Sequence, residues 1–91
     1  MRHARAEALD ALEPLLARIR AHGLLREKSR GIFYLGSRAF LHFHEDPAGL
    51  FVDIRGADPK DFDRFKVDAA GEAEVLARVA ALTRPKGTLR P

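Results

Sequence analysis

The chain has 91 residues, which can bury one modest hydrophobic core, so we expect a single domain. Its composition, 46% hydrophobic and 32% charged, is typical of a folded protein, and the lack of cysteine excludes disulfides, thiolate metal sites and nucleophilic cysteine chemistry. The formal net charge is +3. No apolar run reaches the roughly 18 residues of a membrane helix, and no signal-peptide pattern follows the basic first residues. We therefore expect a cytoplasmic protein without a membrane partner.

An amphipathic pattern near the N-terminus predicts the first helix. The apolar residues that recur at helical spacing are Leu9, Leu12, Leu16 and Ile19. Gly23 is suited to end this helix. Because an interior proline removes a backbone donor and clashes with the preceding turn, we expect the regular helix to start near Glu13, with Pro14 in its first turn. Residues 24–30 are expected to form a charged connection to a sheet.

Three consecutive antiparallel strands are predicted between residues 31 and 55. The expected strands are residues 31–35, 38–45 and 50–55, and the expected tight turns are residues 36–37 and 46–49. In the first hairpin, Ile32 is expected to face Leu41. In the second hairpin, His42 is expected to face Asp53.

The predicted pairing divides these strands into two faces. The first face is apolar and is expected to pack against the helices; it holds Ile32, Tyr34, Ala39, Leu41, Phe43, Leu50, Val52 and Ile54. The second face mixes apolar and ionisable side chains; it holds Phe33, Leu35, Arg38, Phe40, His42, His44, Phe51, Asp53 and Arg55. We expect the second face to be covered by residues 57–67, to form a homodimer surface through Phe40, His42 and Phe51, or to receive a ligand.

The C-terminal third is expected to add an edge element and a second helix. An edge strand or a packed loop can be formed by Phe62, Phe65 and Val67. Asp68 can cap a helix at about residues 70–83. The buried side of that helix is expected to hold Val75, Val79 and Leu82. Residues 85–91 are polar and proline-rich, which predicts a mobile basic tail.

Together these elements predict a single α+β domain over residues 1–91, folded at about 7–84, with an antiparallel sheet of three or four strands flanked by an N-terminal and a C-terminal helix.

The order of a helix, a hairpin sheet opening with RGIFYLGSRAFLHF, an irregular acidic stretch and a closing helix resembles a short version of the MmcQ/YjbR family over about residues 9–83. Its members are small, largely uncharacterised bacterial proteins whose fold has been likened to a double-wing DNA-binding arrangement. The resemblance implies nucleic-acid binding and no established catalytic residues.

The ionisable side chains of the second face have two chemical interpretations. His42 and His44 project the same way from one strand, and Asp53 opposite can supply a carboxylate, so these residues can bind zinc or iron. His42 and Asp53 can instead form a cross-strand hydrogen-bonded pair, which would raise the pKa of His42. We favour the pair and expect His3 and His22 to be unrelated. Acid-base catalysis by the His–Asp pair is a further interpretation, which we rank below metal binding because no serine or threonine lies in a nucleophile motif.

Basic residues concentrate between residues 18 and 38, where six of them stand against Glu27 alone. Because such side chains gain by displacing counterions from phosphates, the predicted nucleic-acid contacts are Arg18, Arg20, Arg26, Lys28, Arg30 and Arg38. The chain has twelve arginines and four lysines. Because a GC-rich genome also favours arginine over lysine, this ratio alone does not indicate nucleic-acid binding. We predict a non-enzymatic binding module for nucleic acid or a protein partner, without a cofactor. The alternative is a small metal-binding protein or metalloenzyme with zinc at His42, His44 and Asp53.

Overall fold

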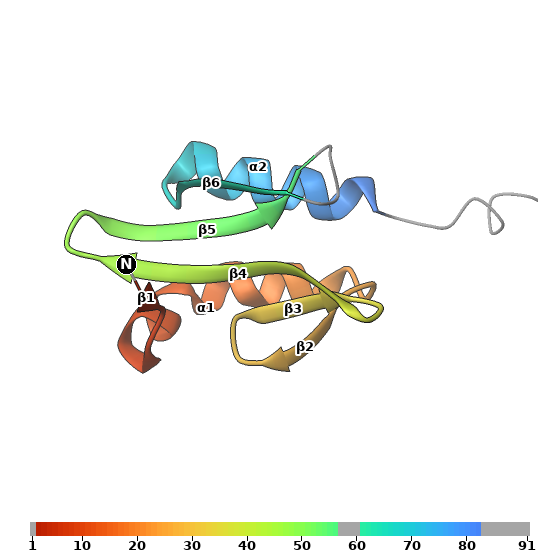
Figure 1. The fold of residues 1–91 in the computed structure, drawn as a ribbon, viewed down its shortest axis with the longest axis horizontal. Helices are drawn as coiled ribbons and strands as arrows, with labels where there is room; N and C mark the ends of the chain where they lie inside the picture. The colour runs from red at the N-terminus through yellow and green to blue at the C-terminus, as the bar shows by residue number, and fades with distance from the viewer. Residues whose placement is uncertain (1, 57–60, 83–91) are drawn as a thin grey trace, which may run out of the picture.

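The computed structural model describes residues 2–56 and 61–82 (Figure 1). The two helices are α1 (Ala6–Ala21) and α2 (Ala69–Ala81). The strands are β1 (Arg2–His3), β2 (Arg26–Ser29), β3 (Ile32–Leu35), β4 (Arg38–Asp46), β5 (Gly49–Arg55) and β6 (Phe62–Lys66). The predicted α+β class is confirmed. The predicted tail at 85–91 and the last residue of the predicted second helix lie outside the described residues.

All strands belong to one antiparallel sheet with the order β2-β3-β4-β5-β6, and β1 pairs with β4 on the edge opposite β5. The predicted edge strand around Phe62 is confirmed as β6. The sheet is larger than predicted because the residues of β1 and β2 were expected to be irregular. The sequence of β2 is REKS, which has no apolar residue to indicate a strand. It pairs with β3 across a turn at Gly31, whose φ of 81° favours glycine.

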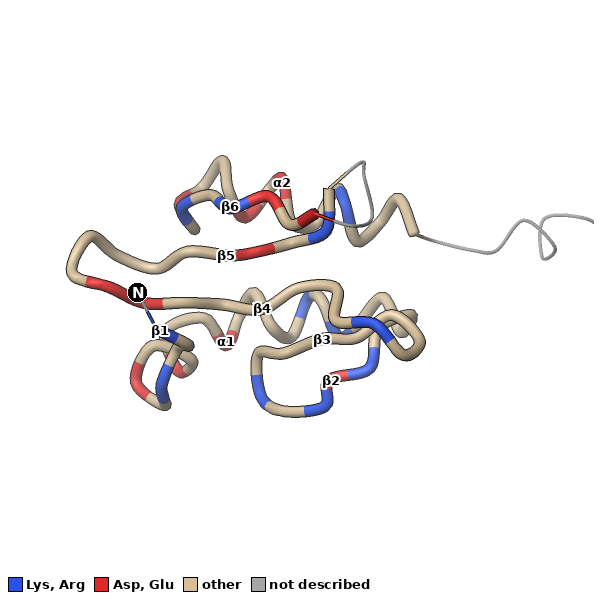
Figure 2. Tube along the Cα trace, in the orientation of Figure 1, with Lys and Arg blue, Asp and Glu red and all other residues tan. Residues whose placement is uncertain are grey.

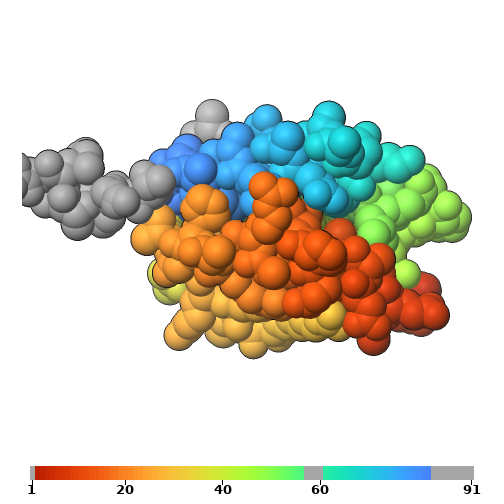
Figure 3. All heavy atoms as spheres, turned by 180° about the vertical axis from the view of Figure 1, so that it is seen from behind, coloured from red at the N-terminus to blue at the C-terminus, as the bar shows by residue number. Residues whose placement is uncertain are grey.

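Both helices cover the same face of the sheet, behind it in Figure 1 and side by side in front of it in Figure 3. The covered face and the apolar sides of the helices form one core, which holds Leu9, Leu12, Leu15, Leu16, Ile19, Phe33, Phe40, Leu41, Phe43, Val52, Ile54, Val75 and Val79. No described helix covers the opposite face. Neither described helix is long and apolar enough to cross a membrane.

The two hairpins differ in how well the sequence predicts their register. In β4 and β5 the predicted register is confirmed, with His42 opposite Asp53. In β3 and β4 it is correct only next to the turn, because the pairing shifts by one residue between Phe33 and Tyr34. Beyond the shift, Phe33 pairs with Leu41, although these two residues were predicted to lie on opposite faces of the sheet. A bulge of this kind inserts one residue into a strand and changes the pairing that follows it.

The register shift corrects the predicted faces near the first hairpin. Phe33 and Phe40 were expected on the second face, but both are buried in the core. Ile32 and Tyr34 were expected in the core, but the alternation of side chains places them on the opposite face from Phe33. Of the three residues predicted for a homodimer surface, Phe40 therefore lies in the core of the described domain.

The first helix begins earlier than predicted. It starts at Ala6 and contains Pro14 in its interior. An interior proline costs about 3 kcal/mol, whereas each fully buried leucine contributes about 1.5 to 3 kcal/mol. Leu9 and Leu12 lie before the proline and are both buried, so their burial offsets its cost. In the second helix, Asp68 is confirmed as the cap, since its Oδ1 accepts a hydrogen bond from the backbone of Gly71 at 2.8 Å.

Candidate functional site on the open face of the sheet

We call the sheet face that points away from α1 and α2 the open face. Side chains alternate along a strand and paired residues share a face, so the observed register determines its members. Lys28 lies at a register shift of β2 and is placed on this face by its contact with the Tyr34 ring. Its apolar and aromatic members are Ile32, Tyr34, Ala39, Phe51 and Phe62. Its ionisable members are His3, Arg26, Lys28, His42, His44, Asp46, Asp53, Arg55, Arg64 and Lys66. The open face therefore contains all three residues predicted for a metal site and two of the six predicted for nucleic acid.

Positive charge dominates the open face. Five basic side chains, from β2, β5 and β6, stand against the two carboxylates of Asp46 and Asp53. The Cα trace shows the basic positions of β2 at one side of the sheet and those of β5 and β6 at the other (Figure 2). Among the described residues, no ion pair involves Arg26, Lys28 or Lys66. These three side chains can therefore meet an external anion without first breaking a described ion pair.

A polar network lies at the centre of this face, around Asp53. Arg64 donates two hydrogen bonds to its carboxylate, from Nε to Oδ1 at 2.6 Å and from Nη2 to Oδ2 at 2.7 Å. His44 Nε2 lies 3.1 Å from the same Oδ2, and His42 Nδ1 lies 3.1 Å from His44 Nε2. His44 and Asp53 are buried, with exposed fractions of 8% and 7%. The network therefore fixes both side chains across β4, β5 and β6.

The protonation of this network differs from the prediction. The imidazole that contacts Asp53 belongs to His44, although His42 is the residue directly opposite. The pKa of His42 is lowered rather than raised, first because burial disfavours the imidazolium and then because His44 lies beside it. The pKa of Asp53 is lowered, mainly by the hydrogen bonds from Arg64. The network thus combines an ionised carboxylate with a His42 ring that favours its neutral form.

His3 was expected to be unrelated to His42 and His44, but it is a member of their cluster. It pairs with His44 in the register of β1 and β4. Its ring centroid lies 4.9 Å from that of His44 and 5.5 Å from that of His42. One ring nitrogen from each of the three histidines lies within 4.8 Å of the others. Nothing in the local sequence indicates this contact, because β1 has only two residues and the helix α1 begins only three residues after it.

Aromatic rings of the open face lie next to cationic groups. The Arg55 guanidinium lies over the ring of Phe62, 4.2 Å from its centroid, and the Lys28 ammonium lies 4.6 Å from the centroid of Tyr34. The rings of His42 and Phe62 also meet in a T-shaped arrangement, with centroids 5.1 Å apart. Phe51, Phe62 and Tyr34 are all half-buried. Each of these rings is therefore anchored in the sheet and partly accessible.

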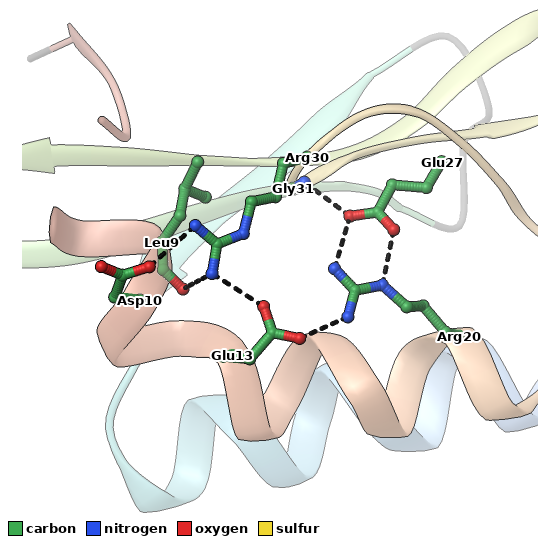
Figure 4. A network of polar contacts seen from close by, with 7 residues as sticks. All are labelled: Leu9, Asp10, Glu13, Arg20, Glu27, Arg30 and Gly31. Atoms are coloured by element: carbon green, nitrogen blue, oxygen red, sulfur yellow. Dashed lines mark hydrogen bonds and ion pairs between the residues drawn. The ribbon is translucent and has the colours of Figure 1, made fainter. Parts of the chain in front are cut away.

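The predicted basic segment is divided by the fold. Arg20 pairs with Glu13 and Glu27, and Arg30 pairs with Asp10 and Glu13 (Figure 4). Because carboxylates from α1 approach these arginines in space, the excess charge counted along the sequence is largely balanced there. Arg18 is exposed on α1 and Arg38 lies at the turn between β3 and β4, whereas Arg26 and Lys28 lie on the open face.

Comparisons with known proteins found no match to this chain among protein-family models, curated proteins or solved structures. The resemblance to the MmcQ/YjbR family therefore remains a prediction.

Proposed function

We propose that this protein is a non-enzymatic binding module whose open face binds single-stranded nucleic acid. The observation that carries the proposal is the combination of five basic side chains and three half-buried aromatic rings on one sheet face that no described helix covers. A polyanion with exposed bases matches both the charge and the aromatic character of such a surface.

The charges account for affinity without sequence preference. Lysine and arginine that contact phosphates release condensed counterions, which makes the binding favourable and dependent on salt. Lys28 and Lys66 are exposed and lie on strands at opposite edges of the sheet, β2 and β6. A strand of nucleic acid that crosses the sheet from one edge to the other would contact both.

The aromatic rings account for a preference for single strands. Unpaired bases stack on aromatic side chains, whereas the bases of a duplex are already stacked on one another. The pairs Arg55–Phe62 and Lys28–Tyr34 each place a cation over a ring. A base that stacks on the ring would take the place of the cation, which could then turn to the phosphate of the same nucleotide. Phe51, on β5 between His44 and Lys66, would add a third stacking position.

Fluorescence anisotropy with a labelled single strand of mixed sequence, measured over a range of salt concentrations, tests the proposal. Lys28→Gln and Lys66→Gln should each weaken binding and reduce the slope of log K against log salt by about 1. Arg18→Gln on α1 removes the same charge away from the open face and should leave binding close to that of the wild type. Phe51→Ala should cost about 1 to 3 kcal/mol if a base stacks on it.

Two results would contradict the proposal. A duplex of the same sequence bound as tightly as the single strand would show that the rings take no part. An Arg18→Gln variant weakened as much as Lys28→Gln would show that total charge, and not the open face, determines affinity.

A further inference from the structure

The three histidines of the open face converge from two segments that are distant in the sequence. His42 and His44 come from β4 and His3 comes from β1, and their nearest ring nitrogens all lie within 4.8 Å of one another. In a tetrahedral zinc site with bonds of about 2.0 to 2.1 Å to nitrogen, ligand atoms are about 3.3 Å apart. His42 Nδ1 and His44 Nε2, at 3.1 Å, are close to that spacing. His3 is exposed, so its side chain can rotate to complete the set.

His44 Nε2 has more polar neighbours than its own chemistry can satisfy. It lies 3.1 Å from His42 Nδ1 and 3.1 Å from Asp53 Oδ2. A ring nitrogen carries either one proton or one lone pair, so it cannot make a full hydrogen bond to both neighbours. A cation among the three atoms would attract all of them. Asp53 can serve such a cation while it is bound to Arg64, because a carboxylate has about four lone-pair directions.

The donor set indicates the class of metal. Imidazole nitrogens favour zinc, copper and nickel, whereas magnesium and calcium prefer sites made of oxygen atoms. The chain has no cysteine, which separates this site from thiolate zinc sites. Histidine ligands bind in the neutral form, and His44 is held in position by burial and by its contact with the Asp53–Arg64 pair.

We propose that His3, His42 and His44, with Asp53 as the fourth donor, bind a divalent transition-metal ion of the zinc, copper and nickel group. The inference is independent of nucleic-acid binding, because it rests on the convergence of the nitrogen atoms and not on the basic and aromatic residues. A bound ion would also join β1 to β4, since its ligands come from both strands.

Isothermal titration of the metal-free protein with Zn²⁺ at neutral pH tests the site, and the histidines of the chain supply their own control. Of its four histidines, only His22 lies outside the cluster, at the exposed end of α1. We expect one Zn²⁺ per chain for the wild type and for His22→Ala. His3→Ala and His42→Ala should each weaken binding at least tenfold. His3 is exposed on a two-residue strand, so its replacement should not unfold the domain.

Several outcomes would overturn the proposal. One is a wild type that takes up no Zn²⁺, and another is a His22→Ala variant that loses binding as His42→Ala does. Binding that is lost in His42→Ala but unchanged in His3→Ala would refute the three-histidine site. Circular dichroism of each variant, recorded before titration, shows whether a loss of binding comes from a folded protein. Thermal unfolding adds a second readout, since Zn²⁺ should raise the Tm of the wild type and of His22→Ala by more than that of His3→Ala or His42→Ala.

Discussion

Leu41 lies in the core between the sheet and the helices and has no exposed surface. Its burial follows from the confirmed register with Ile54 and from the bulge that brings Phe33 opposite it. Replacing a fully buried leucine with alanine removes its transfer free energy and leaves a cavity. A single residue therefore reports whether the assigned core face is correct.

We expect Leu41→Ala to reduce the free energy of unfolding by about 2 to 5 kcal/mol. Leu35 provides the matched control, because it is exposed by 39% at the end of β3. The same substitution there should change stability by less than about 0.5 kcal/mol. Equilibrium unfolding in urea measures both variants. Equal losses at the two positions would contradict the assignment of the core.

The candidate site could be predicted only where the strand pairing determines position. His42, His44 and Asp53 could be placed on one face because the period of a strand is two and the turn at 46–49 fixes the register. Which histidine reaches Asp53 depends on how the side chains lean, and this has no signature in the sequence. His3 could not be found, because its strand exists only through pairing with β4.

At the scale of elements, carboxylates attach α1 to the hairpin of β2 and β3. Arg20 on α1 forms ion pairs with Glu13 and with Glu27 of β2, and Glu27 also accepts a hydrogen bond from the backbone of Gly31 at 2.8 Å. The pKa of Glu27 is lowered, mainly by its hydrogen bonds from Arg20. The pKa of Glu13 is lowered as well, by Arg20 and Arg30. Folding therefore favours the ionised form of both glutamates.

This linkage predicts an acid dependence of stability. A lowered pKa in the folded state stabilises the protein above the ordinary glutamate pKa of about 4.3, and this contribution disappears as the pH falls through the lower folded value. Arg20→Gln should therefore reduce stability at pH 7 and flatten the decline on acidification. Arg18→Gln, on the same helix, should keep the wild-type profile. Urea unfolding between about pH 7 and pH 3 measures the effect. If the stability of Arg20→Gln falls on acidification as steeply as that of the wild type, other carboxylates cause the fall.

The elements differ in how far the sequence determines them. The hairpin of β4 and β5 was predicted because apolar residues alternate on both sides of a turn that holds proline and glycine. The strand β2 was not, because four polar residues form it through pairing with β3 alone. The start of α1 was misplaced because the local cost of Pro14 is offset by tertiary burial that a local argument does not include.

At the scale of the whole molecule, the two faces of the sheet separate stability from recognition. The covered face holds the apolar core, and Arg20 and Arg30 are paired with carboxylates of α1 and β2. The open face holds three cations that take part in no described ion pair, together with aromatic rings and the histidine cluster. The two proposals therefore share one surface. If both are correct, they must be coupled energetically, since a bound metal adds two positive charges to the face that contacts phosphates.

This coupling gives a prediction that rests on both proposals. Zn²⁺ at a saturating concentration should tighten the binding of single-stranded DNA by the wild type, because the added charge attracts phosphate. By linkage, the DNA must tighten Zn²⁺ binding by the same factor. At the lowest Zn²⁺ concentration that saturates the wild type, the effect should persist in His22→Ala and be smaller in His3→Ala, whose weaker site is only partly filled. Anisotropy titrations with and without Zn²⁺, at constant ionic strength, measure it. Weaker DNA binding in Zn²⁺ would instead mean that bases contact the histidine rings directly and that metal and nucleic acid compete for them.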